Sequence, residues 1–141
     1  MSYYPLNSIP DYFGIDSLLT EEHLLIRQSV RDWVESFVMP KIDEAAQNHT
    51  DIPNLMKELG KIGALGPYIP EEYGGSGLDQ ISYGIIMQEL ERGDSAVRSA
   101  ASVQSSLVMF PINEYGSEEQ KKKFLPQLAS GDMIGAFGLT E

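Results

Sequence analysis

Residues 89–111, with the sequence ELERGDSAVRSAASVQSSLVMFP, constrain the fold most, because they are long enough for several helical turns yet their middle consists of small residues. At about 100° per residue, one face of such a helix combines a guanidinium with two hydroxyls and a thioether, from Arg98, Ser102, Ser105 and Met109. Arginine offers paired donors that match a carboxylate, and small neighbours allow a close approach. The face therefore resembles a narrow groove with one cationic group in it.

The residues alone leave two interpretations of this face open. In the structural one, small side chains at positions 96, 100, 101 and 105 let a neighbouring helix pack closely, while Arg98 forms a weak ion pair with Asp94 one turn earlier. In the functional one, the same face is an anion clamp for a small ligand.

Composition limits the classes of partner. A chain of 141 residues can bury one real core but cannot form a second complete domain. Its ten basic and 21 acidic residues give a formal charge of −11, which repels phosphate backbones and anionic lipid, so we expect no nucleic-acid partner. No apolar run approaches the roughly 20 residues of a membrane span, so we expect no membrane insertion.

Metal and thiol chemistry are not expected either. The chain has no cysteine, which excludes disulfides, thiolate metal sites and a cysteine nucleophile. Its two histidines, His23 and His49, lack metal-ligand spacing to another strong ligand, and we expect both at the surface. The N-terminus shows neither a signal-peptide nor a transit-peptide pattern, which favours a cytoplasmic location.

The first half of the chain predicts helices joined by loops. Residues 1–17 read as an extended arm, because they contain aromatic residues and prolines without a helical period. Thr20 is the expected N-cap of a long amphipathic helix that Pro40 bends or interrupts. Thr50 or Asp51 is expected to cap a second helix. The glycine-rich residues 63–79 form a loop, and they match no phosphate-binding motif.

The second half predicts more helices and then a strand. Asp79 or Ser82 begins a helix that closes near residues 93–94, where the small-residue helix opens. Gly116 is expected to end that helix in the left-handed conformation. Ser117 and Gln120 form a capping box for a short helix that Pro126 limits or extends by another turn. The apolar residues after position 132 predict a first strand whose partners are missing.

Three stretches resemble one family. ERGDSAVRSAASVQSSLVMFPI, YGSEEQKKKFLPQLASG and GAFGLTE closely resemble the N-terminal half of acyl-CoA dehydrogenases, and among these the glutaryl-CoA dehydrogenases most of all. The resemblance extends from Leu19 to Glu141. It implies a mostly α fold: an arm (1–17), the N-terminal helical domain of the acyl-CoA dehydrogenase fold (18–131), and the first strand of a missing middle β domain (132–141).

The resemblance also implies chemistry and partners. Family members use FAD to form an α,β double bond in an acyl-CoA, with a glutamate as base and the flavin as hydride acceptor. That glutamate would lie in a region this chain lacks, so no catalytic residue is expected here and the chain alone should be inactive. In the complete enzyme, glutaryl-CoA would be the favoured substrate, with possible decarboxylation to crotonyl-CoA. An electron-transferring flavoprotein would be the partner, and the enzyme would form a homotetramer.

Two groups of site residues follow from the resemblance. Three residues resemble those that hold the distal carboxylate of glutaryl-CoA: Arg98, Ser99 and Ser102. Five resemble the start of the flavin-binding segment: Phe137, Gly138, Leu139, Thr140 and Glu141. The alternatives are a short- or branched-chain acyl-CoA dehydrogenase and, in another class, a cofactor-free helical module for protein interaction.

Overall fold

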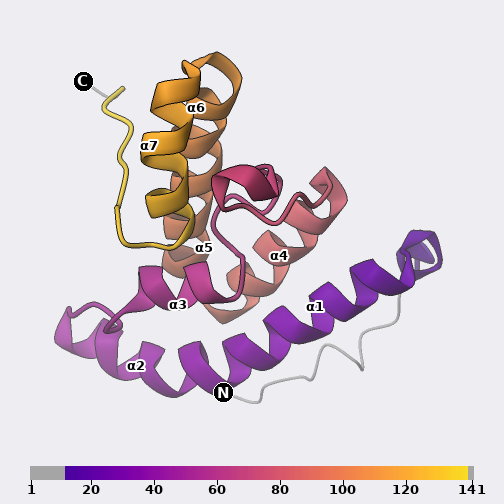
Figure 1. The fold of residues 1–141 in the computed structure, drawn as a ribbon. Helices are drawn as coiled ribbons and strands as arrows, with labels where there is room; N and C mark the ends of the chain where they lie inside the picture. The colour runs from indigo at the N-terminus through magenta and orange to yellow at the C-terminus, as the bar shows by residue number, and fades with distance from the viewer. Residues whose placement is uncertain (1–11, 140–141) are drawn as a thin grey trace.

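The computed structural model describes residues 12–139, and its regular elements over that range are helices, with no β-strand (Figure 1). The mostly α fold is therefore confirmed. The elements are η2 (Ile15–Leu18), α1 (Glu21–Trp33), η3 (Val34–Val38), α2 (Met39–Asn48), α3 (Leu55–Lys61), η4 (Glu71–Tyr73), α4 (Gln80–Gly93), α5 (Ser95–Ser102), η5 (Val103–Met109), α6 (Phe110–Tyr115) and α7 (Glu118–Ala129). Most of the expected N-terminal arm lies outside the described residues.

Helix α1 begins at the predicted cap. The Thr20 side chain accepts a hydrogen bond from the His23 backbone at 3.2 Å, and the Thr20 N–H donates to His23 Nδ1 at 3.2 Å. The ring therefore carries its proton on Nε2, which faces Asp79 Oδ2 at 3.1 Å. His23 is only 7% exposed, so the expectation of a surface histidine was wrong for it, because both ring nitrogens serve helix caps. His49 is exposed as expected.

Two helices continue past a proline through a wide π-helical turn. The π-helical segment η3 ends two residues before Pro40, and η5 ends two residues before Pro111. A proline has no N–H and its ring collides with the carbonyl four residues earlier, so a wider turn relieves the clash. Within this turn the Phe37 carbonyl accepts a bond from Lys41 Nζ at 3.0 Å. Pro40 thus lies where the helix continues from α1 into α2 with a change of direction, which agrees with the expected bend (Figure 1).

Two predicted helix boundaries were wrong. Helix α3 begins at Leu55 after Asn54, and not at residues 50–51. The reason is Pro53, because the residue before a proline avoids the helical region and so delays the start. Gly116 has φ −73° and ψ 152°, which is extended and not left-handed. A glycine is needed there because a Cβ would lie 2.4 Å from the Ile112 carbonyl oxygen.

The start of α7 is confirmed, and the structure decides between the two expectations for Pro126. Ser117 and Gln120 form the predicted capping box, with the Ser117 N–H donating to Gln120 Oε1 at 2.8 Å. Pro126 lies inside the helix, which continues to Ala129. The proline therefore does not limit α7, and the helix continues by about another turn beyond it.

The core consists of two clusters. The first joins η3, α4 and the chain around α3, and its fully buried side chains include Val34, Val38, Leu59 and Leu90. The second joins the loop before α4, η5 and α7. Its members are Ile69, Tyr73, Met109, Leu125, Leu128 and Ala129. The helix formed by α5 and η5 thus contributes to both clusters, Val97 and Ala101 to the first and Met109 to the second.

A buried ion network fastens α1 to α4. Glu89 is 1% exposed and accepts from Arg31 at 2.7 and 3.0 Å and from Arg92 Nε at 3.2 Å. Arg92 also donates to Glu35, which lies in the π-helical segment η3, at 2.7 Å. Burial of a carboxylate is tolerated here because two guanidinium groups compensate it. The network fixes the end of α4, from which the candidate site begins.

The last described residues do not form a strand. Residues 133–139 have no regular secondary structure. A strand needs a partner, and none of the other described residues forms one. The assignment of 132–141 as the first strand of a β domain stays a prediction, as does the boundary at residue 131.

Candidate functional site

The junction between α4 and α5 sets the position of Arg98. Asp94 is extended, with φ −168° and ψ 139°, so it ends α4 and starts α5. Its carboxylate accepts from the Ala96 N–H at 2.7 Å and the Val97 N–H at 3.4 Å, as an N-cap does. The Asp94 carboxylate thus caps α5 and does not pair with Arg98. The ion pair between Arg98 and Asp94, expected in the structural interpretation, was wrong.

The partner of Arg98 is Glu91, in the last turn of α4. Arg98 Nε donates to Glu91 Oε2 at 2.6 Å, and Ser95 Oγ donates to Glu91 Oε1 at 2.8 Å. These two bonds, that of Arg98 first, hold the pKa of Glu91 below its ordinary value. Glu91 and Ser95 were both missed from the sequence, because a spacing of seven residues becomes a close pair only across the α4–α5 junction.

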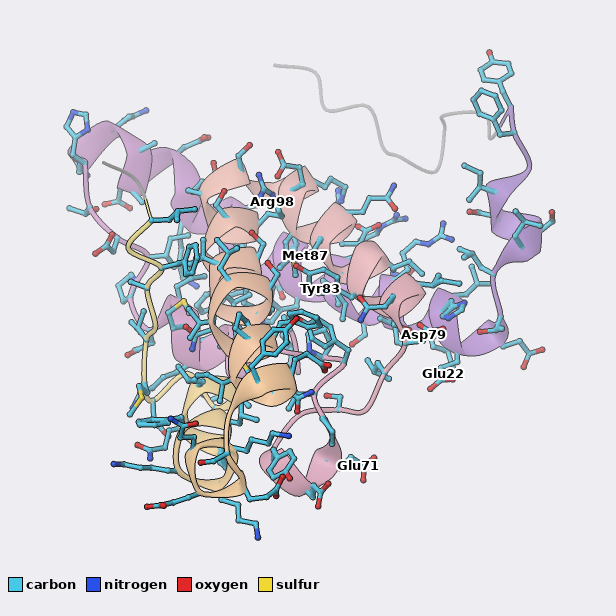
Figure 2. The ribbon with its side chains drawn as sticks, turned by 90° about the horizontal axis from the view of Figure 1, so that it is seen from above. Glu22, Glu71, Asp79, Tyr83, Met87 and Arg98 are labelled. Carbon is cyan, nitrogen blue, oxygen red and sulfur yellow. The ribbon has the colours of Figure 1, made fainter. Side chains whose placement is uncertain are left out.

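The Arg98 guanidinium keeps one edge accessible. Its side chain is 36% exposed, Nη1 lies 3.4 Å from Ser102 Oγ, and Nη2 has no hydrogen-bond partner among the described residues. Ser99 is half-buried, and within residues 12–139 its hydroxyl makes no hydrogen bond. Figure 2 places Arg98 beside the C-terminal part of α4, far along the helix from Asp79 at its start. The structure thus places Arg98 and Ser102 one turn apart on α5, beside Ser99, and the Arg98 Nη2 and the Ser99 hydroxyl make no hydrogen bond among the described residues.

The expected face divides where η5 begins. Ser105 and Met109 are fully buried, and Ser105 Oγ donates to Ala101 O at 2.7 Å while accepting from Gly66 N–H at 2.8 Å. A π-helical turn holds more residues than an α-helical turn, so positions after 102 rotate away from a face counted at about 100° per residue. The face that carries Arg98 and Ser102 is continued by Ser106 instead of Ser105. Ser106 is half-buried, and its hydroxyl donates to the Ser102 carbonyl at 2.6 Å. Pro111 was the available signal for this shift.

The segment after α7 passes beside η5. Gln104 Oε1 accepts from the Gly135 N–H at 2.9 Å, and beyond that point Phe137 and Leu139 are 50% and 72% exposed. A Cβ at Gly138 would meet nothing within 4 Å. Thr140 and Glu141, the other two predicted flavin-binding residues, lie outside the described residues.

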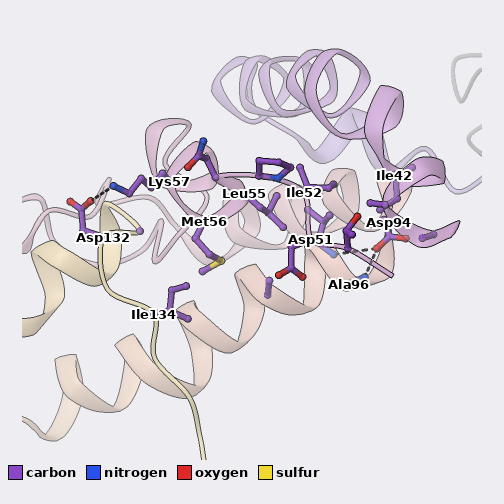
Figure 3. A pocket seen from close by; sticks show the side chains of 18 residues that line it. Ile42, Asp51, Ile52, Leu55, Met56, Lys57, Asp94, Ala96, Asp132 and Ile134 are labelled. Atoms are coloured by element: carbon purple, nitrogen blue, oxygen red, sulfur yellow. Dashed lines mark hydrogen bonds and ion pairs between the residues drawn. The ribbon is translucent and has the colours of Figure 1, made fainter. Parts of the chain in front are cut away.

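A separate cavity of about 950 Å³ lies between the loop before α3, the start of α5 and residues 131–134 (Figure 3). Its walls are mainly apolar, with Ile52, Met56 and Ile134 among them, and Lys57 pairs with Asp132 at 3.2 Å beside it. None of the predicted substrate residues lines this cavity. It is therefore distinct from the candidate site around Arg98.

Two further chemistries find no support in the part of the chain that the structure describes. It contains no group of three or more histidine, aspartate or glutamate side chains arranged to hold a metal ion. None of its helices combines the length and the apolarity that crossing a membrane requires.

Comparison with known proteins shows the family of this chain. Residues 20–132 match the family described as acyl-CoA dehydrogenase, N-terminal domain. An acyl-CoA dehydrogenase of Bacillus subtilis is 41% identical over 124 residues, which cover 87% of this chain and 32% of that protein. The chain thus spans about a third of the length of this relative.

Solved structures agree in sequence and shape. A glutaryl-CoA dehydrogenase of Mycobacterium smegmatis in complex with FADH2 is 46% identical with a TM-score of 0.87, covering 92% of this chain and 33% of that one. The butyryl-CoA dehydrogenase of Megasphaera elsdenii is 36% identical with a TM-score of 0.80, covering 87% and 33%. The family match covers most of the chain, and the chain therefore belongs to the acyl-CoA dehydrogenase family, through that family's N-terminal domain.

Proposed function

We propose that this chain is the N-terminal helical domain of an FAD-dependent enzyme that forms an α,β double bond in an acyl-CoA, with glutaryl-CoA as the favoured substrate. The observation that carries the proposal is the Arg98 guanidinium, which Glu91 holds at 2.6 Å while its Nη2 has no partner among the described residues. The similarity to a glutaryl-CoA dehydrogenase supports the same substrate. The base and most of the cofactor site would belong to the rest of the enzyme.

Arg98 would select the substrate by its distal carboxylate. A free carboxylate in an apolar acyl pocket costs several kcal/mol unless it is paired. The accessible Nη2 edge of Arg98 and the neighbouring Ser99 hydroxyl offer donors that such a carboxylate needs, and Ser102 would add another by turning its hydroxyl away from the Ser99 carbonyl, to which it donates at 3.2 Å. A butyryl group makes no use of those donors, so the site should favour glutaryl over butyryl.

The segment of residues 137–139 fits a role in holding FAD. Its three residues are exposed, and their backbone groups make no hydrogen bond within the described range. Such amides suit the polar edge of a flavin ring, and the Thr140 hydroxyl and Glu141 would extend the same segment. When bound, FAD would supply the hydride acceptor. In the complete enzyme we further propose an electron-transferring flavoprotein as the partner and a homotetrameric assembly.

The runner-up is a dehydrogenase for short-chain or branched acyl-CoA. The similarity to a butyryl-CoA dehydrogenase favours it. A cofactor-free helical interaction module is disfavoured by the family membership. The absorbance of bound flavin in the purified complete protein separates this module from both enzymes.

The test is the substrate selectivity of variants at Arg98 in the complete enzyme. For Arg98→Leu, we expect the ratio of kcat/KM for glutaryl-CoA to that for butyryl-CoA to fall about 100-fold, because the loss of a few kcal/mol of ion pairing affects only the dicarboxylic substrate. Arg98→Lys should retain part of the ratio, since it keeps the charge but not the paired donors. Arg27→Leu is the control, because this arginine on α1 pairs with Asp16 outside the site. Equal losses for both substrates would reject glutaryl-CoA.

A further inference from the structure

Gln104 is a buried glutamine that the proposed function does not use. It lies in η5 and is 1% exposed. Its Nε2 donates to the Leu128 carbonyl at 2.9 Å and to the Met133 carbonyl at 2.8 Å, and its Oε1 accepts from the Gly135 N–H at 2.9 Å. Both N–H donors and the acceptor of the amide are thus used, on backbone groups 24 to 31 residues away.

The two bonds to residues 133 and 135 have the pattern of strand pairing. In a parallel ladder, one residue donates its N–H to the carbonyl of residue i−1 on the partner and accepts at its own carbonyl from the N–H of residue i+1. The Gln104 amide does the same around Ile134, with the Met133 carbonyl and the Gly135 N–H. The side chain therefore acts as a strand partner one residue long, in a part of the fold where the described residues form no strand.

Gly135 brings the segment close to η5. A Cβ at this position would lie 2.4 Å from Val108 Cγ1, so only glycine fits without a shift. Successive N–H groups of an extended segment point to opposite edges. Because Gln104 holds the N–H of Gly135, it determines which edge carries the N–H groups of the next residues, up to Leu139 in the elongated trace of Figure 1.

We propose that Gln104 is a positioning residue for the flavin-binding segment: its amide sets the register of residues 133–135, and this register places the backbone N–H groups at 137–139 for FAD. The inference rests on the proposed function, because it assigns FAD to that segment. Gln104 itself contacts neither cofactor nor substrate in this account.

The first measurement follows the hydrogen bonds between the Gln104 amide and residues 133–135 in the absence of the cofactor. Amide hydrogen exchange is recorded by mass spectrometry on the complete enzyme freed of FAD. In Gln104→Met, which keeps the volume but loses all three bonds, we expect exchange in the peptide covering 133–139 to become roughly tenfold faster or more, since the Gly135 N–H loses its acceptor. Peptides of α1 and α4 should not change. Gln127→Met is the matched control, because the Gln127 side chain is exposed and, among the described residues, bonds only to the Lys123 carbonyl of its own helix, while the Gln127 backbone carbonyl that accepts from the Met133 N–H is retained in the variant.

The second measurement is the Kd of the same proteins for FAD. We expect Gln104→Met to raise the Kd roughly tenfold or more, and Gln127→Met to leave it unchanged. Gln104→Glu gives a readout that a merely structural role would not move. When deprotonated it has no donor for the two carbonyls, whereas when protonated it regains one, so its FAD affinity should improve from alkaline to mildly acidic pH relative to wild type.

Gly135→Ala keeps Gln104 but displaces the segment from Val108, so it should reproduce both effects even if Gln104→Met does not fold. Faster exchange with an unchanged Kd for FAD would overturn the positioning role, as would unchanged exchange in every variant. A wild-type enzyme that binds no FAD would overturn the proposed function and this role together. Because exchange is measured without FAD, an enzyme that binds no FAD is distinguishable from one in which Gln104 does not hold residues 133–135.

Discussion

Glu91 determines how Arg98 is held, and its surroundings can be tested one atom at a time. The carboxylate accepts from Arg98 on one oxygen and from Ser95 on the other, at 2.6 and 2.8 Å. Since these bonds stabilise the charged form, they lower the pKa of Glu91. The arginine is thus oriented by a carboxylate that is itself oriented by a hydroxyl.

For Ser95→Ala, we expect the pKa of Glu91 to rise but to stay below its ordinary value, because the Arg98 bond remains. A carboxylate with a depressed folded-state pKa stabilises the fold above its unfolded-state pKa, and this contribution disappears as the pH falls through the folded-state pKa. The stability difference between Ser95→Ala and wild type should therefore shrink in acid. An NMR titration of the Glu91 side chain gives the pKa, with Ser29→Ala on α1 as the control. An unchanged pKa would contradict the second bond.

At the scale of elements, a tyrosine fastens the loop before α4 to α7. Tyr73 in η4 is buried, and its hydroxyl donates to Glu118 Oε2 at 2.7 Å in the first turn of α7. This bond is the main reason why the pKa of Tyr73 is raised to about 12, and it also lowers the pKa of Glu118.

Tyr73→Phe should lower the free energy of unfolding by about 1 kcal/mol, the usual net value of one hydrogen bond. A raised tyrosine pKa contributes stability below the unfolded-state pKa, and this contribution is lost as the pH rises towards about 12, so the difference between variant and wild type should shrink in strong alkali. Urea unfolding provides the measurement. Tyr115→Phe is the matched control, because that side chain is largely exposed. Equal effects of the two substitutions would show that the bond to Glu118 adds nothing.

Local signals explain which elements the sequence predicts correctly. The caps at Thr20, Asp79, Asp94 and Ser117 are each formed by a side chain and a backbone N–H two or three residues away, so a short window contains the whole interaction. The buried ring of His23 is different, because its second partner lies 56 residues further along the chain. Sequence spacing cannot reveal such a partner.

The candidate site shows the same division. Arg98, Ser99 and Ser102 share one helix and were identified correctly as neighbours. Ser105 was placed on the same face, but the π segment η5 turns it into the core. Where a π turn forms before Pro111 depends on how both flanking helices pack. A count of residues at a fixed angle per residue leaves out the extra residue of such a turn.

At the scale of the whole molecule, the Glu89 network joins the first helix to the helices that carry the site. For Glu89→Gln, we expect the free energy of unfolding to fall by roughly 3 kcal/mol, because Arg31 and Arg92 lose a buried carboxylate. Glu35→Gln, on the exposed side of the same network, should cost less than about 1 kcal/mol. Calorimetric unfolding compares the two. Similar losses in both variants would contradict a special role for the buried carboxylate.

The central claim is that this helical domain presents Arg98 to the distal carboxylate of an acyl-CoA. The most direct test is the steady-state kinetics of the complete wild-type enzyme with glutaryl-CoA and butyryl-CoA in parallel. The account predicts a kcat/KM for glutaryl-CoA at least about tenfold above that for butyryl-CoA, because only the dicarboxylic substrate can use the free edge of the guanidinium. Equal values, or a preference for butyryl-CoA, would contradict it.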